Sequence, residues 1–90
     1  MESLMDKKID QLMGQPGMAG VCVADANGLP LSARGSLKPD VAPLASQLLT
    51  FCSQLEPSSS VTPEIVLSGD HNKVTFSKKD ELILVLHQNS

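Results

Sequence analysis

The sequence predicts a single α+β domain in which two helices flank a five-stranded, mainly antiparallel sheet. Three observations lead to this prediction. Apolar residues recur with helical spacing in two segments, and shorter segments with strand patterns lie between and after them. Turn residues separate the strands. With 90 residues the chain has room for one core, so we expect the order helix, two strands, helix, three strands over residues 1–90.

Composition narrows the function classes. The chain is 41% hydrophobic and 19% charged, with a net charge of -3, which is typical of a globular protein. Its seven basic residues are scattered and it has no Trp or Tyr, so nucleic-acid binding is not expected. No apolar run approaches the ~20 residues that span a bilayer, and the first residues do not have the order of a signal peptide. We therefore expect a cytoplasmic protein without direct membrane insertion.

The first helix is expected over residues 2–14. Its apolar residues lie at helical spacing, with polar residues between them: Met5, Ile9, Leu12 and Met13. Gly14 and Pro16 are expected to end it, because Gly accepts a left-handed C-cap and Pro cannot continue the helix.

Residues 20–35 are expected to form a hairpin around Asn27 and Gly28, which supply the positive backbone angles of a tight turn. The first strand is apolar on both faces: Val21, Cys22, Val23 and Ala24. It should therefore lie inside the sheet. Pro30 in the second strand lacks the donor that a central strand needs, so this strand is placed at a margin. Cys22 and Cys52 are expected to be reduced and to pack as small apolar side chains.

The second helix is expected over residues 38–55, with Pro39 at its first position and Pro43 close behind. The residues expected to face the core are Val41, Leu44, Ala45, Leu48, Leu49, Cys52 and Leu55. With Ala42 and Phe51 the apolar arc reaches about 180°, wider than a core-facing stripe requires. The opposite arc is polar but uncharged: Ser46, Gln47, Thr50, Ser53 and Gln54. Two interpretations remain open, a partner-covered face and a mildly polar exposed face.

A polar connector, residues 56–63, leads to three further strands at 64–68, 73–77 and 82–86. The segments 69–72 and 78–81 are the expected turns. Because the last strand is apolar on both faces, it should lie in the middle of the sheet beside the first strand.

No arrangement of residues indicates an enzyme. The sequence has no nucleophile elbow, dinucleotide fingerprint or phosphate-binding loop. His71 and His87 have no second ligand at metal-binding spacing. Lys78 and Lys79 are expected to be a solvated turn rather than a membrane-binding cluster. We therefore expect no catalysis, no cofactor and no metal.

The segment 64–68 is the natural candidate for the second margin of the sheet. Glu64 and Pro63 guard only its start, so its backbone groups should be open to strand addition by a partner. The expected partner interface joins this strand to the preceding helix: Gln47, Thr50, Phe51, Gln54, Glu64, Ile65, Val66, Leu67 and Ser68.

Two ordered sets of residues carry a family resemblance. The first is Gly20, Val21, Asp25, Gly28, Leu29, Leu31, Arg34, Gly35 and Leu37. The second is Pro63, Val66, Leu67, Asp70, Lys78, Asp80, Val85 and His87. With them the chain resembles the hepatitis B virus X-interacting protein family, the small roadblock-type subunits of the Ragulator (LAMTOR) complex. Pro30 and Pro43 depart from the family's pattern.

The resemblance implies a roadblock/LC7-like fold, without the extra C-terminal helix of longer roadblock proteins, and a non-catalytic scaffold role. The implied partners are a second small roadblock subunit, other Ragulator subunits, the Rag GTPases and the hepatitis B virus X protein. The implied location is the surface of lysosomes and late endosomes, reached through a lipid-anchored subunit, in amino-acid signalling to the mTOR kinase complex.

Two alternatives remain open at this point. A GTPase regulator would need a catalytic finger, for which Arg34 is the sole arginine available. A dynein light chain-like adaptor would have a similar topology and different partners.

Overall fold

The elements follow the predicted order. In the computed structural model, which describes residues 4–55, 64–79 and 81–89, they are α1 (Leu4–Met13), β1 (Met18–Asp25), β2 (Pro30–Gly35), α2 (Val41–Leu55), β3 (Glu64–Ser68), β4 (Asn72–Lys79) and β5 (Leu82–Asn89). The connector predicted at residues 56–63 and Asp80 of the last predicted turn lie outside the described residues.

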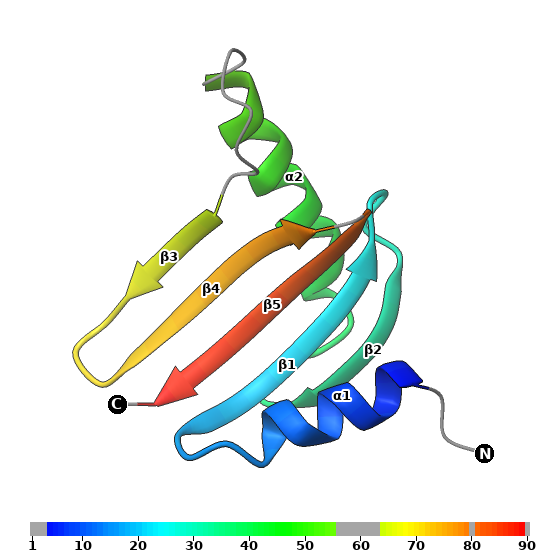
Figure 1. The fold of residues 1–90 in the computed structure, drawn as a ribbon. Helices are drawn as coiled ribbons and strands as arrows, with labels where there is room; N and C mark the ends of the chain where they lie inside the picture. The colour runs from blue at the N-terminus through cyan, green and yellow to red at the C-terminus, as the bar shows by residue number, and fades with distance from the viewer. Residues whose placement is uncertain (1–3, 56–63, 80, 90) are drawn as a thin grey trace.

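The strands form one five-stranded sheet in the order β2-β1-β5-β4-β3, visible from right to left in Figure 1. Every neighbouring pair is antiparallel. The apolar strands β1 and β5 lie side by side inside the sheet, and β2 and β3 are its two margins. These four placements confirm the sequence predictions, and they follow from the need to bury strands that are apolar on both faces.

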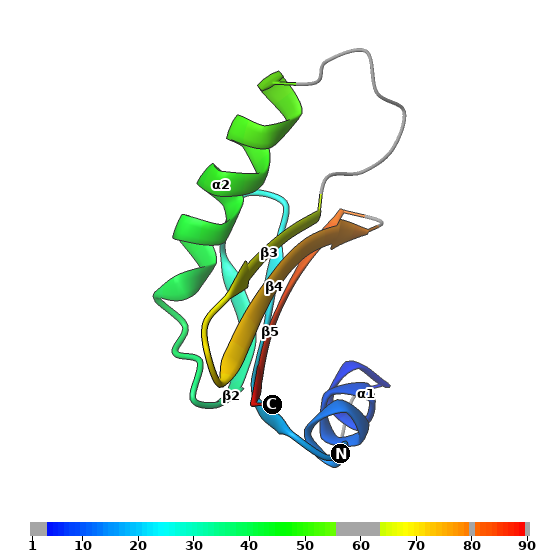
Figure 2. The ribbon, with the colours of Figure 1, turned by 90° about the vertical axis from the view of Figure 1, so that its left-hand side faces the viewer.

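The helices cover opposite faces of the sheet (Figure 2). On the α2 face, a core cluster includes the buried Ala45 and Leu49 of the helix and Phe76, Ile83 and Val85 of the strands. A smaller cluster on the other face joins Ile9 of α1 to Val21 and Val23 of β1. The alternation of β1 between these clusters explains why all its central side chains are buried.

The turn between β1 and β2 closes against α2. The Asp25 carboxylate accepts hydrogen bonds from the backbone N–H groups of Asn27 and Leu29, each at 2.9 Å. The sequence predicted positive angles at both Asn27 and Gly28, but only Gly28 has one, with φ +88°. A Cβ at Gly28 would lie 3.1 Å from Pro43 Cα, so the turn needs glycine for close approach to the helix as well.

Several boundary predictions were wrong. The strand predicted at 82–86 continues to Asn89, and Gly14 follows α1 without the positive φ of the expected left-handed cap. The second helix begins at Val41, and Pro39 lies in the turn before it, where its carbonyl accepts a hydrogen bond from the Ala42 N–H. Lys78 and Lys79 belong to β4 rather than to a turn, because they pair with Ile83 and Leu82 of β5. Glu81, the residue before β5, takes a positive φ of 69°.

Candidate partner-binding surface

The open margin of the sheet is formed by β3, which pairs with β4 along one side only. At the adjoining turn the Gly69 N–H donates to the Asn72 carbonyl at 2.8 Å. Hydrogen-bonded and non-hydrogen-bonded pairs alternate along an antiparallel ladder. Because Gly69 is hydrogen-bonded to the β4 side, every second residue before it is as well. The backbone groups of Leu67 and Ile65 therefore point toward β4. The N–H and C=O groups of Glu64, Val66 and Ser68 therefore point outward.

The side chains of β3 leave this margin apolar. Ile65 is half-buried and packs against the core cluster under α2. Leu67 lies on the same face and is 55% exposed, whereas Val66 lies on the opposite face and is 49% exposed. Glu64 is the sole charge in the strand and stands at its first position. The devices that usually protect a strand edge, an inward charge or a central proline, are not present between Ile65 and Ser68.

The helix α2 carries an exposed apolar row beside its buried face. Its members recur at intervals of four, three and four residues: Leu44, Leu48, Phe51 and Leu55. Leu44, Phe51 and Leu55 are exposed, while Leu48 is half-buried and packs against the same core cluster as Ile65. Such spacing places the four side chains in one row, here called the α2 stripe. Figures 1 and 2 show that the C-terminal end of α2 projects beyond the sheet.

The predicted interface residues of α2 are exposed, but the helix is rotated from the predicted orientation. Gln47, Thr50, Phe51 and Gln54 face outward as expected. Leu44 and Leu55, predicted to face the core, are instead 52% and 66% exposed. Ser46, predicted to face away from the sheet, donates to the Ala26 carbonyl at 3.3 Å. The 180° apolar arc in the sequence was the signal for the α2 stripe, because one sheet face covers less than that.

A second exposed apolar region lies on the other face of the sheet. A groove of about 510 Å³ runs between α1 and the adjoining strands. Its walls include Leu4, Leu12, Leu82 and Leu84, with Lys8 and Lys79 also lining it. No local pattern in the sequence reveals this groove, because the part of the sheet that a helix leaves uncovered depends on the tertiary arrangement.

The cysteine and histidine side chains lie in different surroundings. Cys22 is buried, and this burial raises the pKa of its thiol, so the thiol stays protonated at neutral pH. His71 is exposed, whereas His87 Nδ1 lies 2.5 Å from Ser36 Oγ. Within the described ranges, no group of three or more His, Cys, Asp or Glu residues could hold a metal ion. Neither α1 nor α2 is long and apolar enough to cross a membrane.

A family model and the similar proteins of known sequence agree on one family. The family model described as Ragulator complex protein LAMTOR5 matches residues 1–88. The LAMTOR5 homolog of Ixodes scapularis is 30% identical over 87 residues, covering 97% of this chain and 94% of that protein. LAMTOR5 of Xenopus laevis is 28% identical over 88 residues, covering 98% of this chain and 97% of that protein.

Solved structures share the fold at lower identity. A Roadblock/LC7 domain from Streptomyces avermitilis superposes with a TM-score of 0.71 at 19% identity, covering 89% of this chain and 72% of that one. The gliding protein MglB of Thermus thermophilus reaches a TM-score of 0.80 at 14% identity, covering 99% and 76%. These likenesses confirm the roadblock/LC7 fold expected from the sequence.

Proposed function

This chain belongs to the LAMTOR5 family of Ragulator complex proteins, and from that premise we propose that it is a non-catalytic scaffold subunit of a Ragulator-type complex. In this role it is the counterpart of the hepatitis B virus X-interacting protein, and residues 1–90 form one roadblock domain. The complex binds Rag GTPases and supports amino-acid signalling to the mTOR kinase complex.

The observation that carries the proposal is the open β3 margin beside the α2 stripe. Both leave apolar groups exposed in a small domain, where every uncovered apolar side chain is costly relative to the size of the core. A second small roadblock subunit would cover them together. Its own edge strand would extend the sheet at Val66, and its own helix would pack on Phe51 and the other residues of the α2 stripe.

The expected interface residues fit this arrangement in two groups. Glu64, Val66 and Ser68 supply the outward backbone groups, and Ile65 and Leu67 supply side chains on the α2 face. Gln47 and Gln54 lie beside the α2 stripe, where uncharged polar side chains lose little when a partner removes them from water. Thr50 is exposed farther round the helix, on the side of Ser46 and Ser53.

The groove beside α1 is assigned to another subunit of the same complex. Its apolar lining and the two lysines favour an amphipathic helix with acidic residues along its flanks. In this account a lipid-anchored subunit brings the chain to the surface of lysosomes and late endosomes. The hepatitis B virus X protein remains a proposed viral partner.

A role as GTPase regulator is less well supported, because the guanidinium group of Arg34 is engaged within the chain, whereas a catalytic finger must reach a bound GTPase. Arg34 lies on β2 and pairs with Asp10 of α1. A dynein light chain-like adaptor would use the same margin and differ in its companions, so the identity of the companions decides between the two roles.

The test is affinity purification of the tagged chain from cells of its own species, followed by mass spectrometry. The proposal expects the other Ragulator subunits in stoichiometric amounts, with Rag GTPases in smaller amounts. Recovery of dynein subunits without Ragulator subunits would overturn it.

A further inference from the structure

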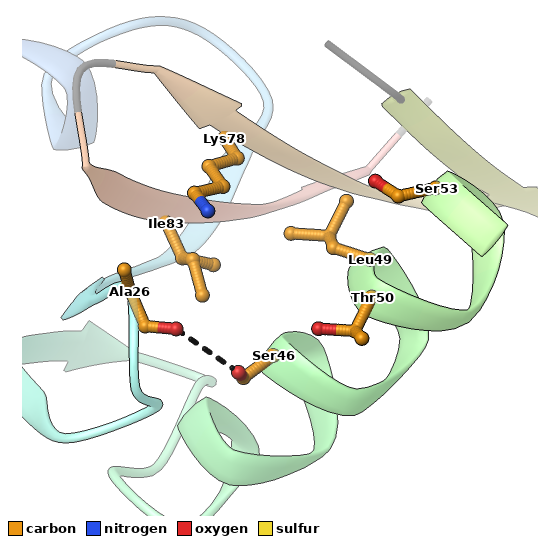
Figure 3. Close-up of a pocket in the computed structure, with 7 residues that line it drawn as sticks. All are labelled: Ala26, Ser46, Leu49, Thr50, Ser53, Lys78 and Ile83. Carbon is orange, nitrogen blue, oxygen red and sulfur yellow. Dashed lines mark hydrogen bonds between the residues drawn. The ribbon is translucent and has the colours of Figure 1, made fainter. Parts of the chain in front are cut away.

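A small polar pocket lies between α2 and the sheet. It has a volume of about 40 Å³. Thr50 is the one residue of its lining that is also predicted for the partner interface. Figure 3 shows Lys78 reaching from β4 toward α2, where Ser46, Thr50 and Ser53 project from successive turns of the helix. Leu49 and Ile83 form the apolar part of the lining.

The polar groups of this pocket have hydrogen-bonding capacity to spare. The Ser46 hydroxyl donates to the Ala26 carbonyl, which leaves its oxygen as an acceptor. The hydroxyls of Thr50 and Ser53 make no hydrogen bond to any described residue. Two donors therefore line the pocket on the helix side, each free to rotate toward a ligand.

Lys78 is the one charged residue of this lining. Lys78 is half-buried, and the ion pairs found among residues 4–55, 64–79 and 81–89 are those of Arg34 with Asp6 and Asp10. Lys78 thus has no carboxylate partner in that part of the chain. A half-buried ammonium beside free hydroxyl donors favours an anion, because charge-assisted hydrogen bonds are stronger than neutral ones.

We propose that this pocket binds a small tetrahedral oxyanion of the phosphate class, with the Lys78 ammonium as its counter-charge and the Thr50 and Ser53 hydroxyls as donors. The size agrees with this class. A water molecule needs about 10–15 Å³ of such space, so about 40 Å³ holds one small group and excludes a nucleotide or a folded peptide. The inference concerns a ligand and is independent of the subunit partner proposed above.

The chain offers a matched control in the next residue. Lys79 is exposed and, because side chains alternate along a strand, it lies on the opposite face, where it lines the groove beside α1. Lys78→Gln and Lys79→Gln remove the same charge from neighbouring positions. Lys78→Arg keeps the charge at the pocket.

The experiment is a titration of the ¹⁵N-labelled full chain with sodium phosphate, with sodium chloride adjusted to keep ionic strength constant. We expect saturable shifts of the amide signals of Thr50, Ser53 and Lys78. Lys78→Gln should weaken the binding about tenfold or more, whereas Lys78→Arg and Lys79→Gln should retain it. O-phosphoserine, titrated in parallel, distinguishes a phosphate monoester from the free ion, and binding of either supports the proposal.

Two results would overturn it. One is the lack of saturable shifts at these amides in the wild-type chain. The other is an equal effect of Lys78→Gln and Lys79→Gln, which would indicate unspecific attraction to surface lysines. The dispersion of the amide spectrum shows in the same experiment whether each variant is folded.

Discussion

The guanidinium group of Arg34, on the marginal strand β2, pairs with the carboxylate of Asp10 on α1. A second guanidinium nitrogen lies 3.8 Å from Asp6 Oδ1, one helical turn earlier. Besides the apolar contacts around Ile9, this pairing joins α1 to the sheet. It also holds the sole arginine of the sequence on the α1 face.

Replacement of this arginine should destabilise the chain only slightly. The side chains of Arg34 and Asp10 are 40% and 44% exposed, so water and salt weaken their attraction. We expect Arg34→Gln to lower the free energy of unfolding by less than about 1 kcal/mol, and the difference to shrink in high salt. Urea unfolding at low and high salt measures both effects, with the exposed Lys38→Gln as control. A large, salt-independent loss would contradict the argument.

A methyl group at Gly35 should be far more harmful. Gly35 has φ +68°, and a Cβ there would lie 2.2 Å from the Ala19 carbonyl oxygen. That oxygen accepts a hydrogen bond from the Ser36 N–H at 2.9 Å, so it cannot move away freely. We expect Gly35→Ala to cost more than about 2 kcal/mol.

Gly14→Ala is the matched control, because a Cβ at Gly14 would meet its nearest atoms at 3.5 Å. Its effect should stay within about 0.5 kcal/mol, as for an ordinary surface substitution. Thermal unfolding of both variants provides the comparison. Equal stability of the two would show that β2 tolerates a side chain at its end.

Cys22 should make the chain less stable at alkaline pH. In the folded chain, burial raises the pKa of its thiol above the usual value of 9.0. In the unfolded chain the thiol is in water and has the usual value. Its contribution to stability is therefore complete below about pH 9 and is lost as pH rises toward the raised pKa of the folded state. Denaturant unfolding across this window should show a steeper loss in the wild type than in Cys22→Ala. An unchanged slope in Cys22→Ala would contradict the assignment.

The α2 stripe should contribute to partner binding rather than to the stability of the chain. Phe51 is 60% exposed, so Phe51→Gln should change the free energy of unfolding by less than about 0.5 kcal/mol. In the complex this ring would be buried, and its loss should weaken binding of the second roadblock subunit about tenfold or more. Calorimetric titration measures the affinity.

The control for Phe51→Gln is Leu4→Gln, which removes a 72% exposed side chain from α1, on the opposite face of the sheet. It should leave that affinity unchanged. If both substitutions weaken binding equally, or if neither does, the α2 stripe is not the surface that the second roadblock subunit covers.

The sequence was sufficient to predict the order of the sheet because local constraints decide it. Pro30 excludes a central place for β2, and the apolar runs of β1 and β5 require burial on both faces. The bounds of β3 were predicted correctly because Pro63 and Gly69 enclose a short apolar run.

The parts of the surface that the sequence analysis missed depend on tertiary partners. The rotation of α2 is set in part by the hydrogen bond of Ser46 to the Ala26 carbonyl, which requires the β1–β2 turn to be in place. The extension of β4 through Lys79 depends on pairing with Leu82. A local pattern of charges indicates solvent exposure, and it does not reveal cross-strand pairing of this kind.

The most direct test of the scaffold account is the effect of Val66→Pro on assembly with the second roadblock subunit. The outward N–H of Val66 makes no bond to β4, and proline lacks this N–H. The substitution should therefore leave the fold intact and block strand addition. Val66→Thr keeps the N–H and serves as control. By sedimentation velocity of the mixed subunits, we expect the heterodimer with Val66→Thr and separate monomers with Val66→Pro. Undiminished heterodimer with Val66→Pro would contradict the account.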